Sequence, residues 1–269
     1  MLTGMEVQTV SGAAIFGMVV SLIISVGLPI AFLIIWRKKS GAKISTFFIG
    51  AVTFVIAALV LEQVFHFVIV KLTGNVLLDN IWLYAIYGGL AAGLFEETGR
   101  LAAMRLCMKK RLDKQNAIMY GIGHGGIEAI LIAGLSGISN IISAILVNSG
   151  MLPTILGSVG DGGQAEAAYT QLSALWTTPA YLFYMSGLER ISAVLLHISL
   201  SYMVYLAVKN RKISWFISAI AIHALTDAGT ILLAQVLPVL VVELILLAFT
   251  GCMIYGVVML YRKEQLHEE

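Results

Sequence analysis

Two adjacent glutamates and an arginine, Glu96, Glu97 and Arg100, interrupt an apolar stretch that carries no other charged residue from Ile81 to Met104. A single ionisable side chain at the centre of a bilayer costs at least ~2.5–3.5 kcal/mol. These side chains must therefore face protein or trapped water, share protons, or pair. Their i, i+3 and i, i+4 spacings let Arg100 hold one or both carboxylates. Such costly residues indicate a function rather than packing.

Three histidines lie in other apolar stretches, and two of them have a carboxylate one helical turn away. His124 and Glu128 are spaced i, i+4, as are His223 and Asp227, so each pair occupies one helix face. Glu128 and Asp227 are therefore candidates for fixing the tautomers of the two histidines. His197 is the third histidine. A lone membrane histidine more often makes a helix–helix hydrogen bond, so the histidines become informative only if they lie together.

The chemistry that suits these groups is hydrolysis. A carboxylate in a water-poor site is a candidate general base near neutral pH, and its natural substrate is a water molecule. Imidazoles opposite it can bind Zn²⁺ or another divalent metal, or can stabilise the oxyanion of a tetrahedral intermediate. Attack of glutamate-activated water on a peptide carbonyl is the simplest reaction that uses every group.

Membrane-spanning helices must position these side chains. The chain has 269 residues, of which 59% are hydrophobic and 12% are charged, and soluble domains carry roughly twice that charged fraction. Continuous apolar runs long enough to cross a bilayer recur along the chain. We predict an all-α, polytopic transmembrane bundle that forms a single integral membrane domain over residues 1–269. Its seven predicted spans cover about 11–36, 44–70, 81–105, 116–147, 178–208, 214–236 and 239–261.

Basic residues fall on alternate connections between these spans. They gather at 37–43, 105–114, 209–212 and 262–263, whereas the other connections carry only Lys71. The positive-inside rule then places the N-terminus outside and the C-terminus inside. We expect a multi-pass protein of the cell membrane, most simply the bacterial cytoplasmic membrane. The expected partners are the lipid bilayer and a membrane-embedded or membrane-proximal peptide, without nucleic acid, and the sequence leaves the oligomeric state open.

The predicted topology places four chemical groups at one depth. At ~1.5 Å of rise per residue, Glu96 lies about 13 Å from the cytoplasmic end of its span. His124, His197 and His223 lie about 15, 18 and 16 Å from theirs. Two of these helices run inward and two outward, so scattered polar residues would rarely agree this closely. The agreement predicts one site, which we expect to be reached from the cytoplasm.

Other polar residues leave more than one interpretation open. Glu62 and His66 are spaced i, i+4, but their estimated depth favours a structural role outside the cluster. For Glu189-Arg190, a structural ion pair and a part of the site are equally favoured interpretations. The glycine-rich run at 121–126 indicates close helix packing, a weakened helix near His124, or both. The long external stretch at 148–177 favours a plain connecting loop over a short helix or lid.

The ordered motifs resemble a known group of proteases. Glu96-Glu97 with Arg100, then His197, then His223 with Asp227, are similar to the three motifs of the CAAX-prenyl-protease and bacteriocin-processing (CPBP/Abi) intramembrane protease superfamily. Those motifs are usually written EExxxR, FxxxH and HxxxN/D. Within this group the chain looks closest to the bacterial YhfC family of intramembrane metalloproteases, which is related to the PrsW proteases. The resemblance covers the third to the sixth predicted span.

The resemblance implies roles for these residues. Glu96 would be the water-activating base and Glu97 its partner, held by Arg100. His197 and His223 would be metal ligands or oxyanion stabilisers. The further ligand would be Asp227 of the third motif or, from its depth and not from the resemblance, His124, and no other cofactor is expected.

The chain departs from the motifs at three places. Arg100 stands one residue early, since Leu101 occupies the motif position, and Ala193 replaces the motif phenylalanine. His124 and Glu128 have no counterpart. These departures leave open which histidines contact the catalytic water and whether a metal takes part.

Two other classes of function remain as alternatives. Buried carboxylates and histidines also form ion pathways, so a proton- or cation-coupled transporter is one of them. The sequence shows no inverted repeat or paired broken helices of the kind that transporters use. A non-catalytic, protease-like membrane receptor is the other.

Overall fold

The structure, a computed structural model, describes residues 8–74, 76–160 and 163–266. Across these residues it contains helices and no strand, which confirms the predicted all-α class. The elements are α1 (Gly12–Ser40), α2 (Ile44–Phe54), η1 (Val55–Glu62), α3 (Gln63–Thr73), α4 (Val76–Asp79), α5 (Ile81–Leu106), α6 (Lys114–Glu128), η2 (Ala129–Gly134), α7 (Leu135–Asn148), α8 (Leu152–Ser158), α9 (Gly163–Thr177), α10 (Ala180–Lys209), α11 (Ile213–Leu233) and α12 (Val239–Leu266). The elements η1 and η2 are π-helical segments.

Each of the seven predicted spans coincides with a helical segment. Within the described residues, six segments are long and apolar enough to cross a membrane, and the chain is a multi-pass membrane protein. The remaining predicted span is α5, a helix of 26 residues. Its apolar sequence is interrupted by Glu96, Glu97 and Arg100, so hydropathy alone does not identify it. Its crossing of the bilayer stays a prediction.

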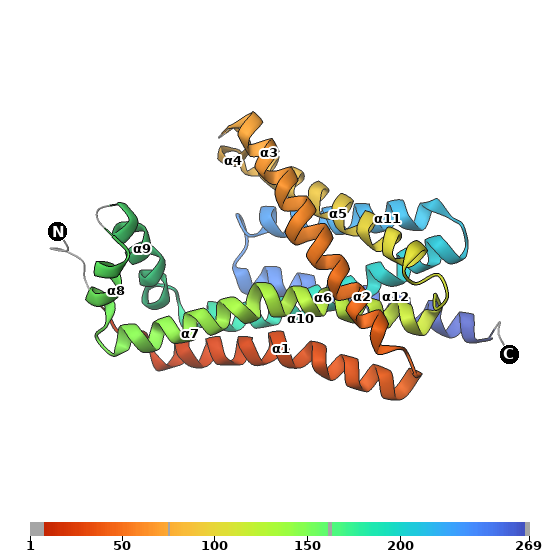
Figure 1. Ribbon diagram of the computed structural model, residues 1–269, viewed down its shortest axis with the longest axis horizontal. Coiled ribbons are helices and arrows are strands. Elements are labelled where there is room, and N and C mark those ends of the chain that lie inside the picture. The colour runs from red at the N-terminus through yellow and green to blue at the C-terminus, as the bar shows by residue number, and fades with distance from the viewer. Residues whose placement is uncertain (1–7, 75, 161–162, 267–269) are drawn as a thin grey trace.

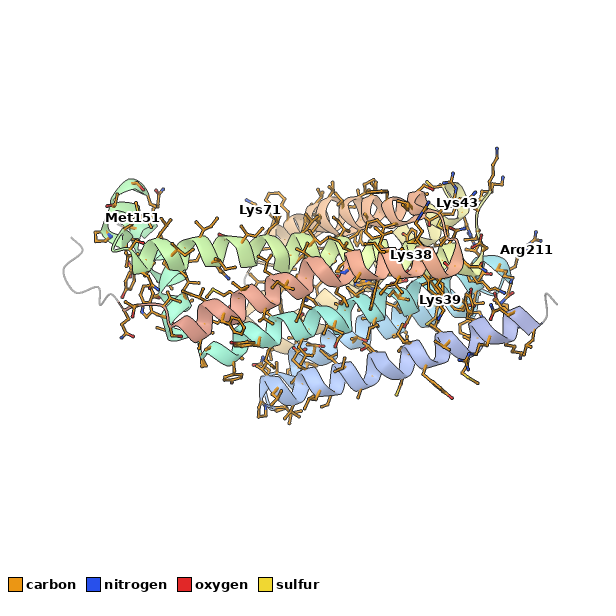
Figure 2. All side chains as sticks on the ribbon, turned by 90° about the horizontal axis from the view of Figure 1, so that it is seen from below. Lys38, Lys39, Lys43, Lys71, Met151 and Arg211 are labelled. Atoms are coloured by element: carbon orange, nitrogen blue, oxygen red, sulfur yellow. The ribbon has the colours of Figure 1, made fainter. Side chains whose placement is uncertain are left out.

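The helices form a bundle around one long axis. In Figure 1, α1, α6–α7, α10 and α12 run along this axis, whereas α2 and α3 cross them diagonally. Helices α5 and α11 pack side by side on the same part of the bundle. Figure 2 shows Lys38, Lys39, Lys43 and Arg211 at one end, which we call the basic end, and Met151 at the other. This agrees with the predicted orientation, which nevertheless stays a prediction.

The stretch at 148–177 contains two helices, so the plain connecting loop favoured by the sequence is wrong. Leu152 and Leu156 of α8 and Leu175 of α9 are buried. They join an apolar cluster with Met18 of α1 and Val147 of α7. Burial of these leucines folds the segment against the end of the bundle opposite to the basic end, because exposed apolar side chains there would face water.

Helix α6 is held tightly between α2 and α10 by the glycines around His124. A Cβ atom on Gly123 would collide with the backbone carbonyl of Phe47 in α2. On the other side, a Cβ on Gly125 would lie 2.9 Å from the Cβ of His197 in α10. The packing interpretation of the glycine-rich run is therefore confirmed. These contacts bring the α6 and α10 histidines together.

We expect Gly123→Ala to destabilise the protein, because its methyl group has no room against α2. Overpacking of this kind costs about 1–3 kcal/mol. Thermal unfolding in detergent should show a lower Tm than the wild type. The matched control is Gly251→Ala in α12, where nothing lies within 4 Å of the added carbon. Equal Tm values for Gly123→Ala and the wild type would contradict the close packing.

Candidate active site

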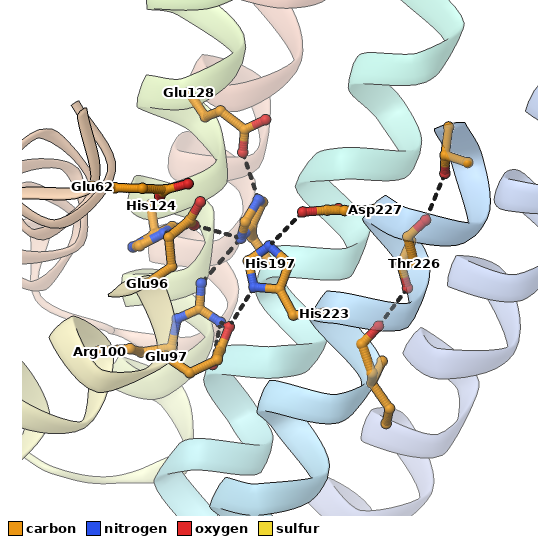
Figure 3. A network of polar contacts seen from close by, with 12 residues as sticks. Glu62, Glu96, Glu97, Arg100, His124, Glu128, His197, His223, Thr226 and Asp227 are labelled. Carbon is orange, nitrogen blue, oxygen red and sulfur yellow. Dashed lines mark hydrogen bonds and ion pairs between the residues drawn. The ribbon is translucent and has the colours of Figure 1, made fainter. Parts of the chain in front are cut away.

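The predicted site residues meet in one buried network between α5, α6, α10 and α11 (Figure 3). All eight of them take part, so the four helices do converge as the depth estimate predicts. Glu97 and Arg100 are 0% exposed and Glu96 is 6% exposed. The network comprises Glu96, Glu97, Arg100, His124, Glu128, His197, His223 and Asp227.

A buried ion pair between Arg100 and Glu97 lies at the centre of the network. One terminal nitrogen of Arg100 donates to both carboxylate oxygens of Glu97, at 2.8 and 2.9 Å. Its other terminal nitrogen lies 3.0 Å from Nδ1 of His197. Glu97 Oε1 also lies 2.9 Å from Nδ1 of His223. The pair therefore connects α5 to both α10 and α11.

Glu96 has separate partners although it is adjacent to Glu97. Its Oε2 lies 2.8 Å from Nε2 of His124 and 3.8 Å from Nδ1 of His197. Successive residues on a helix point about 100° apart, so neighbouring carboxylates reach different partners. The spacing lets Arg100 hold one or both carboxylates, and in the structure it is bonded to Glu97 and not to Glu96.

A second chain of contacts holds His197 from the other side. Its Nε2 lies 2.5 Å from Oε2 of Glu128. Arg190 donates to Oε1 of Glu128 at 2.9 Å and also pairs with Glu189. Glu189 and Arg190 therefore form an ion pair that is linked to the network through Glu128, and a part in the chemistry stays a prediction.

The two glutamates of α5 differ in their access to open space. A cavity of about 600 Å³ is lined by Glu96, together with His197, His223 and Asp227. Glu97 does not line it. Glu96 can therefore contact a water molecule or a substrate, whereas Glu97 is enclosed by its ion pair.

The residues present fit a divalent metal in their chemistry. Glu96, His197 and His223 each offer a ligand atom, and these atoms lie within 4.8 Å of one another. Two imidazoles and a carboxylate are a donor set that catalytic zinc takes. Glu97 occupies Nδ1 of His223 and so leaves Nε2 for a ligand, as carboxylates beside metal-binding histidines commonly do.

Two details refine the predicted ligand set. Among the described residues, the group that could hold an ion includes neither His124 nor Asp227, which were the predicted further ligands. Asp227 instead lies 3.6 Å from Nε2 of His223. Arg100 occupies Nδ1 of His197, so a metal at that nitrogen would have to replace the guanidinium contact.

Glu62 lies closer to the site than the sequence predicts. It is buried and interacts electrostatically with Glu96, and Figure 3 draws it beside Glu96 and His124. Its Oε1 lies 3.1 Å from Nε2 of His66, whose Nδ1 lies 2.6 Å from the Tyr87 hydroxyl. The depth estimate was wrong because α2–η1–α3 crosses the bundle diagonally, so residue counts overstate its depth.

One π-helical segment adjoins a carboxylate of the network, and the other ends at Glu62 beside it. The segment η1 ends at Glu62, and η2 begins directly after Glu128. Single π turns inside α-helices occur frequently at functional sites. Each segment shifts the register of its helix, and the i, i+4 pattern of the sequence contains no signal for that shift.

Comparisons with known proteins identify a family for this chain. Residues 24–246 match a family described as YhfC intramembrane metalloprotease. The chain is also 38% identical over 226 residues to a Bacillus subtilis (strain 168) protein named uncharacterized membrane protein YhfC, covering 83% of this chain and 86% of that protein. No solved structure matches the chain.

We expect Arg100→Lys to destabilise the fold, because an ammonium group cannot reproduce the guanidinium contacts with both Glu97 and His197. Breaking a buried pair costs about 3–5 kcal/mol, and the retained charge should recover part of that amount. Unfolding in detergent by denaturant measures the difference. Arg105→Lys, at an exposed position on the same helix, should change stability by less than about 0.5 kcal/mol. Equal effects of the two substitutions would contradict the central role of the pair.

Proposed function

This chain belongs to the YhfC intramembrane metalloprotease family, and from that premise we propose that it is an endopeptidase that hydrolyses a peptide bond with water activated by Glu96. The observation that carries the proposal is the different position of the two glutamates. Glu96 faces a cavity beside two histidines, whereas Glu97 is closed off by Arg100 and His223. A carboxylate that is held in place and faces open space can reach the proton of a bound water molecule, as a general base must.

The surrounding residues define how Glu96 would act. His124 holds its Oε2 and thereby orients the carboxylate toward the cavity. A water molecule in the cavity would give a proton to Glu96 while its oxygen attacks the peptide carbonyl. Glu96 would then return the proton to the leaving amine nitrogen. The base is thus regenerated in each cycle.

His197 and His223 would hold a divalent metal together with one carboxylate oxygen of Glu96, which leaves the other oxygen of Glu96 to act as the base. When bound, such a metal supplies Lewis acidity that polarises a carbonyl oxygen and makes water easier to deprotonate. Glu128 fixes His197 through Nε2, and Glu97 fixes His223 through Nδ1. These carboxylates keep each ring in one orientation, which lowers the reorganisation that catalysis would otherwise need.

We extend the proposal to the wider group and to the substrate. The motif order supports a place among the CPBP/Abi and PrsW-related proteases, with the departures at Leu101 and Ala193. The site lies within the helix bundle, so its substrate would be a membrane-embedded or membrane-proximal peptide. The transporter and receptor alternatives have no specific observation in their favour.

We expect Glu96→Gln to abolish cleavage, because an amide cannot accept the proton of water. Loss of a general base lowers rates by about 10²–10⁴-fold. The assay offers a library of membrane peptides to purified protein in proteoliposomes and detects products by mass. Glu264→Gln is the matched control, since Glu264 contacts Lys209 at the basic end and should leave the rate unchanged.

Undiminished cleavage by Glu96→Gln would refute the assigned mechanism. Cation flux through the same proteoliposomes, with no cleavage of any peptide by the wild type, would favour a transporter instead.

A further inference from the structure

A hydrolytic site inside a bilayer needs a supply of water, and this site lies near the middle of the membrane. His197 lies twelve residues from Lys209, or about 18 Å along α10. Glu189 lies twenty residues from Lys209, or about 30 Å, which equals the thickness of the hydrocarbon core. Glu189 therefore reaches the membrane boundary opposite to the basic end. His197 lies about 12 Å from that boundary and Glu96 about 17 Å from it, so the distances to the two sides are similar.

The cavity at Glu96 extends toward this opposite boundary. Beyond the site residues it is lined by Tyr84 in the first turn of α5 and by Glu189 and Arg190 of α10. Thr230 and Ile231, near the end of α11 that is distant from Lys212, also line it. The cavity thus lies on the side away from the basic end, whereas the sequence predicts access from the basic end.

A second cavity adjoins the first one. It has a volume of about 240 Å³ and lies between α1, η2–α7 and α10. Both cavities are lined by Ile132, Glu189 and Arg190. Several small polar side chains line the second cavity, as expected for a surface in contact with water: Ser21, Ser136, Asn140 and Ser186.

Arg190 stands where the two cavities meet. Its guanidinium binds Glu128 and Glu189, and the residue lines both cavities. Buried arginines that pair with two carboxylates are held in one position. The second cavity and the cavity that contains Glu96 therefore meet at a charged side chain that is held in one position.

Large side chains fill the path from the basic end to the site. Met104, Tyr120, Leu200 and Tyr202 are all 0% exposed in the layer between the site and that end. A pocket of about 400 Å³ opens at the basic end and reaches as far as Leu101. A larger apolar cavity of about 930 Å³ runs from Cys107 at that end to Phe95, along the outside of α5. None of the network residues lines either of them. Glu97 and Arg100 remain completely buried.

We propose that water reaches Glu96 from the end of the bundle opposite to the basic end, through the second cavity and past Arg190. A volume of about 600 Å³ holds roughly twenty water molecules at the liquid share of ~30 Å³ each. The purpose of this passage rests on the proposed hydrolytic function. Its existence does not, because accessibility to water is measurable without any cleavage.

The test uses single cysteines and a membrane-impermeant thiol reagent applied to either side of the membrane. Cys107→Ser and Cys252→Ser remove the two native thiols. Ser136→Cys then probes the second cavity and Thr230→Cys the cavity at Glu96. Ile213→Cys, 59% exposed at the basic end, is the marker for the other side.

We expect Ser136→Cys and Thr230→Cys to react with reagent applied to the side opposite to that of Ile213→Cys. Their reaction from that side should be at least about tenfold faster than from the other side, because thiolates form only where water enters. Leu225→Cys, 72% exposed on the same helix as Thr230, should face lipid and react slowly from both sides. If Thr230→Cys fails to fold, Ile231→Cys replaces it, since it lines the same cavity.

Reaction of Thr230→Cys from the side of Ile213→Cys would overturn the proposal. So would protection of Thr230→Cys and Ile231→Cys from both sides. Glu96→Gln added to the same variants should leave the labelling unchanged. A failure of the passage is therefore distinguishable from a failure of the proposed protease function.

Discussion

The buried pair of Glu97 and Arg100 is the interaction on which the rest of the site depends. Both side chains are completely buried, and a buried charge is tolerated only when its partners are well placed. The pair meets this condition by binding His197 and His223, which come from two other helices. Close approach of these helices is thus a requirement of the electrostatics as well as of the packing.

Small residues allow these helices to approach each other closely. A Cβ on Gly89 would collide with the carbonyl oxygen of Ala224, and one on Gly93 would lie 2.9 Å from that of Ile220, so α5 and α11 meet almost backbone to backbone. Glu97 can then reach His223. Glu96, one residue earlier, points to another side and faces the cavity. The fixed pair supplies rigidity, and the neighbouring carboxylate remains free for chemistry.

Much of this arrangement is predictable from the sequence. The bundle follows from the apolar runs, and the meeting of His124, His197 and His223 follows from their depths in the predicted spans. The position of Glu62 was not predictable, because the diagonal course of its helix and the π segment that ends at it have no sequence signal. The partners of the two glutamates also depend on helix rotation, which spacing alone leaves undetermined.

The central claim is that Glu97 and Arg100 fix His197 and His223 beside Glu96, where these residues would hold a metal that replaces the Arg100 contact at Nδ1 of His197. Metal analysis of purified protein loaded with zinc and then desalted tests it most directly. The account predicts about one zinc per chain in the wild type and in Glu264→Gln, and loss of that zinc in His223→Ala. Full zinc content in a folded His223→Ala variant would contradict the account.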